Sequence, residues 1–524
     1  MNTQTKILKK MKTPAKFLLT LMLITGSYAQ AAVRYVTETG AGSKDGSSWT
    51  NASNDLQAMI NASAANDQVW VATGTYKPTH RADNFDAVST TDRYNAFVLK
   101  KDVQLYGGFS GNETALTARP KDNKSTLSGD IGVINDNSDN VYHVLISAGE
   151  VGTASVDGFI ITKGNANGIY TDQMTINGYV IPGNSGGGIY NVSSSPFITN
   201  MVILNNTGDY GAGILNDGTT STFSNVVIKD NVATYGGGGM RNHYNSTSSP
   251  TLINVLIAGN TASSGGGMQT LGNSSPVLIN VTIVNNKATN SAGYEGGGGM
   301  CNSVVVRSGA KIPTPKLYNS IVYGNTASKT TTGNNNIVNE PELSYTCSPS
   351  YSYCLVGESG GSGNWDDNLG INVGNNIDAD PLFVNTETGN YRLQVNSPCI
   401  NAGDNSAIPA DVTTDLSGNT RVVGAKVDMG AYEYNDAINS VNTVTADKDF
   451  VIYPNPVKDV INIYAKTNDN IKRVTVTNSR GMVVYNEQGD TDYWKVVVNN
   501  YPAGVYVVTA QNDLTTNTYK VIIK

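Results

Sequence analysis

The sequence predicts an all-β protein in which a right-handed parallel β-helix solenoid is followed by a small C-terminal β-sandwich of immunoglobulin type. The first observation is a repeat. Between residues 186 and 325, a Gly-rich block and an Asn-bounded apolar block alternate five times. The Gly blocks start 25, 26, 28 and 32 residues apart, a period typical of solenoids. The second observation is a change after residue 449 to short apolar strands at roughly 10-residue spacing, which is typical of a sandwich.

The chain begins with a pattern typical of a secretory signal peptide. A basic segment precedes an apolar stretch at residues 17–25, and Ala29 ends a small-x-small cleavage site, with a second candidate at Ala31. The apolar stretch has nine residues, well short of the ~20 needed to span a bilayer, so a membrane anchor is disfavoured. We therefore expect a signal peptide over residues 1–29 and export of the mature protein.

The charge balance argues against nucleic acid as a partner. The net charge is −7 and only 15% of the residues are charged. The sequence displays no basic patch that would neutralise phosphates.

Residues 33–434 are expected to form the β-helix, with residues 33–110 as its N-terminal cap. Residues 55–65 carry apolar side chains at helical spacing, and residues 67–76 alternate as a strand. A helix and a strand at this end would cover backbone groups that could otherwise pair with another chain. Residues 157–164 resemble a degenerate first copy of the apolar block.

The five apolar blocks place the same residue types in the same columns. The third residue after each leading Asn is apolar, and since alternate strand positions share a face, this column is expected to form a continuous core. Its members are Ile203, Ile228, Ile257, Ile283 and Val322. The Asn that closes each block tolerates left-handed backbone, and its amide can bond to the next copy in a ladder. These are Asn206, Asn231, Asn260, Asn286 and Asn325. The copies must stack in parallel by winding, and the crossover rule makes the winding right-handed.

The repeats resemble the Gly-Gly-Ala/Gly-Ile and Phe-x-x-Asn motifs of polymorphic outer-membrane proteins. Residues 197–200 read Phe-Ile-Thr-Asn, and later copies depart at the Phe. More broadly, residues 33–434 resemble secreted bacterial β-helix proteins of the choice-of-anchor Q type. The matching segments are residues 45–49, 70–76, 106–113, 127–130, 380–383 and 428–433. The resemblance implies secretion and a variable surface anchor, and it assigns no chemistry.

The end of the β-helix region is less regular. Residues 326–379 are rich in Thr, Asn, Gly and Ser and are expected to form a loop excursion. Residues 380–434 are expected to cap the solenoid, and residues 435–448 resemble a linker. The predicted cap contains Asp404, Asp415, Arg421, Asp428 and Glu433. In one interpretation these acids form a structural calcium site; in the other they hydrogen-bond turns and pair with the arginine. No other cofactor is predicted, and no metal ligand is assigned.

Residues 449–524 resemble the type A C-terminal sorting domain of the Bacteroidetes type IX secretion system. The resemblance is carried by the sorting motif Tyr453, Pro454, Asn455 and Pro456, and by Gly504 and Tyr506. Tyr501 stands where the family usually has Leu, which is a mild departure. The resemblance implies that the type IX machinery is a partner and that the chain crosses both membranes. The domain would then be removed, leaving the passenger attached to the outer membrane at the cell surface or released.

Residues beside the Gly blocks are the candidates for ligand binding. They are Tyr210, Tyr235 and Tyr294, each just before a Gly block, and Tyr190, Arg241 and Gln269 in the presumed outward column after it. Stacked along one edge, the tyrosine rings would offer a platform to a polysaccharide or a host or cell-surface glycan. The alternative interpretation is that the rings cover turns.

No residue is assigned a catalytic role. Glycoside hydrolases need two or three close carboxylates, and no column of the repeats stacks two acids in adjacent coils. We therefore favour a non-enzymatic surface protein with a binding, adhesive or structural role. The alternatives are a secreted polysaccharide lyase or glycoside hydrolase, and a shielding protein without a specific ligand.

Four cysteines remain in the exported chain, where disulfides are allowed. Cys347 and Cys354 stand seven residues apart in a loop, so a local disulfide and two free thiols are both consistent with the sequence. CxxC spacing is absent, which disfavours a zinc site.

Overall fold

The computed structural model describes residues 31–435 and 450–524, apart from residues 122, 170, 244–247, 290–295, 307–310, 329–332, 466–469, 479–481 and 513–515. The predicted signal peptide (1–29) and all but the first residue of the predicted linker (435–448) therefore lie outside the described residues. In the described part of the chain, no helix is long and apolar enough to cross a membrane.

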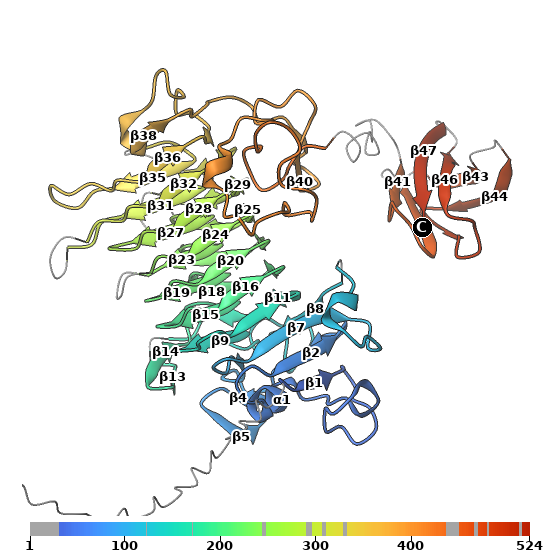
Figure 1. Cartoon of the computed structure of the whole chain (residues 1–524), viewed down its shortest axis with the longest axis horizontal. Helices are drawn as coiled ribbons and strands as arrows, with labels where there is room; N and C mark the ends of the chain where they lie inside the picture. Colours follow the sequence, from blue (N-terminus) through green and yellow to red (C-terminus); the bar gives the residue numbers. More distant parts are fainter. Residues whose placement is uncertain are drawn as a thin grey trace, which may run out of the picture.

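The chain winds into a parallel β-helix from β1 to β38, which confirms the predicted fold (Figure 1). The repeats contribute strands to four parallel sheets, which we number by their order after a Gly block. Sheet 1 contains β6 (Phe97–Val98), β9 (Leu145–Ala148), β15 (Ile189–Val192), β19 (Ile214–Asp217), β23 (Met240–Asn242), β27 (Met268–Leu271), β31 (Met300–Ser303) and β35 (Ile337–Glu340). Sheet 2 contains β1 (Val33–Val36), β2 (Gln68–Ala72), β7 (Gln104–Phe109), β10 (Ser155–Asp157), β16 (Phe197–Thr199), β20 (Thr222–Ser224), β24 (Thr251–Ile253), β28 (Val277–Ile279), β32 (Lys316–Tyr318), β36 (Ser350–Ser352) and β38 (Ile371–Gly374).

Sheets 3 and 4 complete each coil. Sheet 3 contains β3 (Thr75–Tyr76), β8 (Ser125–Ser128), β11 (Phe159–Thr162), β17 (Val202–Leu204), β21 (Val227–Lys229), β25 (Leu256–Ala258), β29 (Thr282–Val284), β33 (Ile321–Tyr323) and β37 (Leu355–Val356). Sheet 4 contains β12 (Asn165–Ala166), β18 (Thr207–Tyr210), β22 (Val232–Gly236), β26 (Thr261–Ala262), β30 (Lys287–Ala288) and β34 (Thr326–Ala327).

The predicted core column lies inside sheet 3. Ile203, Ile228, Ile257, Ile283 and Val322 are partners in successive parallel registers, and each is 0% exposed. The closing asparagines form the predicted ladder. In the ladder, Asn206 Nδ2 donates to Asn231 Oδ1 at 3.0 Å, and each later pair repeats the bond at 2.9 Å. Buried amides that satisfy one another hold the coils in register without leaving a polar group unpaired.

The left-handed backbone lies in other columns than the sequence suggested: at the leading asparagine and at the residue just before the closing one. Among the described residues, the leading asparagines have positive φ, from 48° to 55°. They are Asn200, Asn225, Asn254, Asn280 and Asn319. This column forms the sharp corner between sheets 2 and 3, whereas the closing column turns inward to make the ladder.

The N-terminal end carries the predicted helix. α1 (Leu56–Ala62) follows η1 (Trp49–Asn51), and the Asp55 side chain caps it by accepting from Ala58 N at 2.9 Å. α1 buries its apolar face against the first coils.

Residues 326–379 were expected to be a loop excursion, but the structure continues the β-helix through them. Ile337, Tyr351 and Val356 are fully buried, and they extend the solenoid core through β35, β36 and β37. The abundant small polar residues of this segment therefore fall at turns and outward positions, where they do not interrupt the buried rows.

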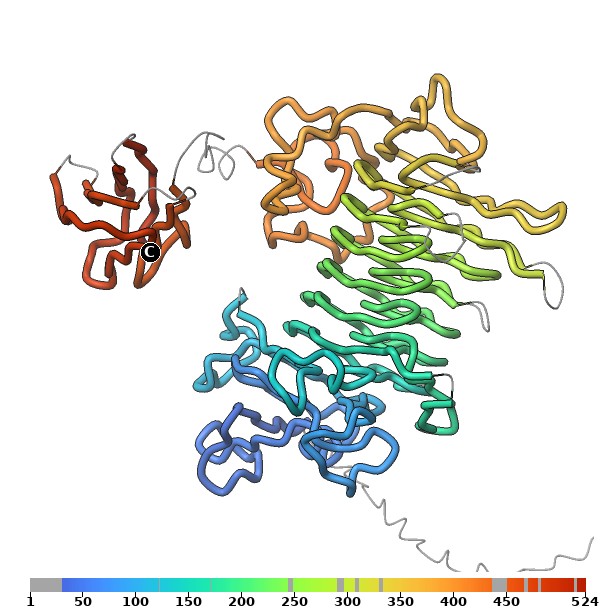
Figure 2. The backbone as a smooth tube through the Cα atoms, turned by 180° about the vertical axis from the view of Figure 1, so that it is seen from behind, coloured from blue at the N-terminus to red at the C-terminus, as the bar shows by residue number. Residues whose placement is uncertain are grey.

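Residues 376–434, here called the strap, lie along the outer face of sheet 3 instead of over the end of the solenoid, which corrects the predicted position of the cap (Figure 2). The strap contains β39 (Phe383–Asn385), β40 (Asn390–Leu393) and η4 (Asn405–Ala407), and η3 (Asp367–Leu369) precedes it. Leu256, Val284 and Ile321 point outward from sheet 3 and pack against strap residues. Burial of these apolar side chains favours this position of the strap.

The C-terminal region forms two antiparallel sheets around one core, as the sequence predicts. One sheet contains β41 (Phe450–Tyr453), β42 (Val460–Ala465) and β45 (Tyr493–Val497). The other contains β43 (Ile471–Asn478), β44 (Val483–Thr491), β46 (Gly504–Gln511) and β47 (Thr516–Ile523). Ile461, Val474 and Val508 are 0% exposed and belong to the same cluster, so the two sheets form a sandwich.

Candidate functional site

The tyrosines predicted to form a platform stack on each other. Tyr210 is the last residue of β18 and Tyr235 the last but one of β22, successive strands of sheet 4, and their ring centroids are 5.0 Å apart at an interplanar angle of 26°. The Arg241 guanidinium carbon lies 4.2 Å from the centroid of the Tyr210 ring. Tyr294 lies outside the described residues. These contacts support the alternative that the rings cover the turns, because each contact occupies a ring face that a sugar would need.

The presumed outward column after the Gly blocks is buried, contrary to the prediction. Tyr190, Arg241 and Gln269 are 4%, 9% and 8% exposed. Tyr190 packs under a hairpin in a cluster with Ile176 and Ile181. The sequence alternation correctly places this column outside the coil, but insertions between strands then cover it.

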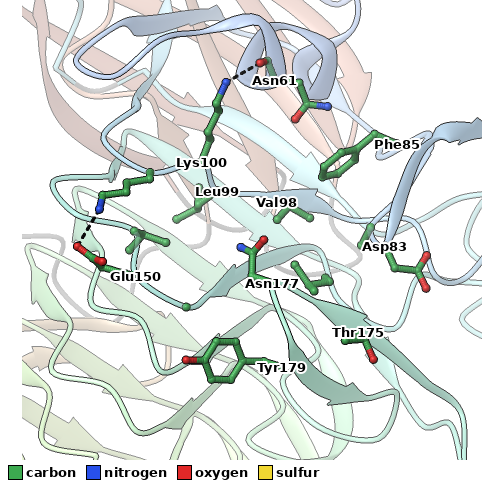
Figure 3. A pocket seen from close by; sticks show the side chains of 15 residues that line it. Asn61, Asp83, Phe85, Val98, Leu99, Lys100, Glu150, Thr175, Asn177 and Tyr179 are labelled. Carbon is green, nitrogen blue, oxygen red and sulfur yellow. Dashed lines mark hydrogen bonds and ion pairs between the residues drawn. The ribbon is translucent and has the colours of Figure 1, made fainter.

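A groove of about 720 Å³ lies beside this column, between two hairpins (Figure 3). We call it the hairpin groove. One wall is the hairpin of β4 (His80–Arg81) and β5 (Asn84–Val88), and the other is the hairpin of β13 (Gln173–Ile176) and β14 (Tyr179–Pro182). Val98 and Leu99 form an apolar floor, and Phe85 and Tyr179 contribute aromatic rings. The volume falls in the range of about 300–1,000 Å³ that is typical of ligand sites.

The second hairpin is built by a specific turn. Asn177 and Gly178 have φ of 52° and 83°, which is the pattern of a type I′ turn between Ile176 and Tyr179. Asn177 Nδ2 donates to Ala148 O at 2.9 Å and ties the turn to sheet 1. The Asn-Gly pair between alternating residues was the sequence signal that would have revealed this wall.

The Tyr179 ring lies against the backbone at Gly149. A Cβ at Gly149 would come 3.1 Å from Cε2 of the ring, so glycine leaves the space that the ring needs. Tyr179 is 36% exposed and Val180, the next residue, is 53% exposed, which leaves an aromatic and aliphatic rim open to solvent.

The first hairpin is anchored by a histidine. His80 Nε2 lies 2.6 Å from Asp55 Oδ2, and His80 Nδ1 lies 2.6 Å from Phe85 O. Burial lowers the pKa of His80, but the hydrogen bonds to Asp55 and to the Phe85 carbonyl outweigh it, and the pKa is raised overall. The pair therefore fixes both the end of α1 and the wall that carries Phe85.

Each charged side chain that lines the hairpin groove has a partner in the protein. Lys100 Nζ donates to the carbonyls of Asn61 and Ser63, and Lys101 pairs with Glu150 at 2.8 Å. Asp83 pairs with Arg81 at 2.7 Å. Asp83 and Glu150 lie at opposite ends of the groove (Figure 3). The arrangement suits an uncharged polar ligand with an apolar face.

The acids of the strap face backbone donors. Asp415 accepts from Ser417 N, Asn419 N and Glu433 N, and Asp428 accepts from Asn401 N and Tyr434 N. Burial, and then the charge of Glu433, raises the pKa of Asp428 to about 6. In the part of the chain that the structure describes, no group of three or more His, Cys, Asp or Glu side chains is arranged to hold a metal ion.

Of the two alternatives for Cys347 and Cys354, a disulfide or two free thiols, the structure has the free thiols. Both residues are free, buried thiols that make separate contacts. Cys347 Sγ donates to Asn302 O at 3.2 Å, and Cys354 Sγ donates to Ser352 O at 3.3 Å. Cys354 belongs to the solenoid core, so its side chain is directed inward by the strand periodicity that the loop interpretation overlooked. Burial raises the pKa of the Cys354 thiol to about 12.

The sorting motif joins strands of the sandwich. Asn455 Oδ1 accepts from Ile522 N at 2.8 Å, and Asn455 Nδ2 donates to Lys520 O at 2.9 Å. The Tyr453 ring stacks on Tyr464 with centroids 5.4 Å apart. Tyr506 Oη donates to Pro502 O at 2.9 Å. These contacts give the motif a structural basis within this domain.

Comparisons with known proteins identify the C-terminal region. Residues 451–524 match the family model of the secretion system C-terminal sorting domain, which confirms the predicted type IX sorting domain. No curated protein matches the chain. Among solved structures, the crystal structure of the pectate lyase Pel9A is similar, with a TM-score of 0.45 and 14% identity over 78% of this chain and 97% of that chain.

Proposed function

We propose that this protein is exported by the type IX secretion machinery and acts at the cell surface as a non-enzymatic glycan-binding protein whose sugar site is the hairpin groove. The sorting domain over residues 451–524 supports export. The resemblance to choice-of-anchor Q proteins supports a surface-displayed β-helix passenger. Attachment to the outer membrane, in place of release, is part of this proposal.

One observation carries the choice of ligand. The groove combines an apolar floor, exposed aromatic and aliphatic side chains, and charges that are already paired inside the protein. The C–H face of a sugar ring stacks on such an aromatic surface, while its hydroxyls reach polar groups of the rim such as Thr175 and Asn177.

The enzymatic alternative has no comparable support. A hydrolase would need an acid and a base, or an acid and a nucleophile, on either side of one glycosidic bond. In the hairpin groove the two carboxylates are each bound to a cation and stand at opposite ends.

A glycan array with the full exported chain tests the proposal. We expect Tyr179→Ala to bind neutral glycans about tenfold more weakly than the wild type does. The reason is that an aromatic contact contributes on the order of 1 kcal/mol beyond its buried area. Tyr345→Ala is the matched control, because Tyr345 is similarly exposed at 41% and does not line the groove. Absence of any retained glycan, or equal loss in both variants, would count against the groove. Incubation with polysaccharides and detection of unsaturated or shortened products tests the enzymatic alternative.

A further inference from the structure

A second groove, of about 680 Å³, crosses the corner between sheets 2 and 3. We call it the basic groove. One wall is the segment that follows η2 (Leu116–Ala118), and the other is the part of the strap around residues 414–418. The floor contains Asn200 and Asn225 from the leading asparagine column. This groove is lined by residues from three distant parts of the chain, and it shares no lining residue with the hairpin groove.

The described residues that line the basic groove carry an excess of positive charge. The cations are Arg119, Lys121, Lys124 and Arg392, and the acids are Asp157 and Asp415. The groove is thus lined by four cations and two acids, whereas the chain as a whole has a net charge of −7. Arg119, Lys121 and Lys124 are close together in the sequence, and the fold adds Arg392 from the strap.

The two acids are occupied inside the protein. Asp157 accepts from Arg119, Thr199 and Asn200 at 2.6, 2.9 and 3.1 Å. Asp415 is 1% exposed and accepts from three backbone N–H groups. Among the described ion pairs, neither carboxylate pairs with Lys121 or Arg392, so the charges of these two side chains face the ligand space.

The cations differ in how they are held. Arg119 is fixed by its ion pair and by the carbonyls of Gly107 and Asp157, to which Nη1 donates at 3.0 and 3.2 Å. Arg392 Nη2 donates to Ser417 Oγ at 2.7 Å, and its Nε is buried with no acceptor in the described structure. Lys121 is exposed at the opposite wall.

We propose that the basic groove binds an anionic polysaccharide, whose carboxylate or sulfate groups lie between the lysines of one wall and Arg392 of the other. A planar guanidinium matches the two oxygens of such a group, while the lysines act as point charges. This site is independent of the hairpin groove and takes a ligand of different charge.

Nucleic acid fits the same groove less well. Single-stranded nucleic acids bind through aromatic rings on which bases stack. Among the described lining residues the aromatic one is Tyr432, and the Arg392 guanidinium already lies 5.3 Å from the centroid of its ring. The acidic net charge also opposes a long polyanion beyond the groove.

Binding of the full exported chain to alginate, a polyuronate, and to heparin, a sulfated polymer, tests the proposal by calorimetry at low ionic strength. We expect Lys121→Gln/Lys124→Gln and Arg392→Gln each to weaken binding at least tenfold and to flatten its salt dependence. Lys316→Gln, an exposed lysine of β32 outside both grooves, is the matched control and should change affinity less than twofold. Tyr179→Ala should also leave this affinity unchanged, which separates the result from that of the hairpin groove.

The polymer that binds identifies the source of the anion. Binding of alginate alone assigns carboxylate, binding of heparin alone assigns sulfate, and either result with the expected variant pattern supports the site. Binding of neither polymer would overturn the proposal. The proposal would also be overturned if the groove variants bound the polymers as the wild type does. Binding of single-stranded DNA in place of both polysaccharides would overturn it too. Unchanged thermal unfolding of the lysine variants checks that the fold is intact.

Discussion

Replacement of Arg421 by methionine is expected to detach the strap from the solenoid. Arg421 is 1% exposed, and its guanidinium pairs with Glu433 Oε2 at 2.8 Å. It also donates to Asn254 Oδ1 and Gly430 O, both at 3.2 Å. The arginine therefore connects the strap to an asparagine of the solenoid corner, 167 residues away along the chain.

The expected cost follows from what the substitution leaves behind. Glu433, which is also 1% exposed by its side chain, would keep a buried charge without its cation, and such a loss typically costs about 3–5 kcal/mol. Arg421→Met/Glu433→Leu should recover much of this loss, because the charge that paired with Arg421 is removed together with it. Arg81→Met is the control: its partner Asp83 and Arg81 itself are 23% and 30% exposed, so the loss should be several times smaller.

The assay combines urea unfolding with hydrogen exchange. We expect exchange in residues 376–434 of Arg421→Met to accelerate while the core of sheet 3 stays protected, since regions with fewer buried contacts open locally. Burial raises the pKa of both Asp428 and Glu433. Since their ionised forms are the costly ones, the deficit of the variant should shrink as pH falls through about 6, the pKa of Asp428. If the hydrogen exchange and the stability of Arg421→Met equal those of the wild type, this account of the strap is refuted.

Three further predictions concern the solenoid. Ile257→Asp should cost more than the about 2–5 kcal/mol of a buried Ile→Ala change, because it adds an unpaired charge to a fully buried row; unchanged thermal unfolding would refute the inward assignment. Asn231→Ala should cost about 1–3 kcal/mol for each buried group left without a partner, the backbone N–H of Asn206 among them, as measured by urea midpoints, and Asn364→Ala, an exposed asparagine outside the ladder, should cost far less. The raised pKa of His80 means that its bond to Asp55 stabilises the fold fully below the unfolded pKa of ~6.5 and that this stabilisation is lost as pH rises through the folded value. His80→Gln should remove that part of the pH dependence of Tm, and an identical profile in the variant would contradict the assignment.

The sequence by itself determined the solenoid and the sandwich. Ile203 and its equivalents return at the same place in each repeat, and a parallel stack is the arrangement that buries them all in one row. The closing asparagines could be assigned to a ladder for the same reason. The seven strands of the sorting domain and its motif also follow from local pattern, because alternation and turn residues act within a few positions of one another.

Only the tertiary structure decided which outward residues meet solvent. Tyr190 is outward in its strand and yet buried, because a hairpin inserted before it folds back over sheet 1. The strap reaches sheet 3 through contacts such as Arg421 with Asn254, and the basic groove joins Lys121 to Arg392. The repeat period and the alternation of residue types determine on which side of its own strand a side chain lies. These sites depend instead on where the long insertions and the strap dock. That docking is set by apolar burial and by pairing between segments far apart in the chain, which a repeat pattern does not encode.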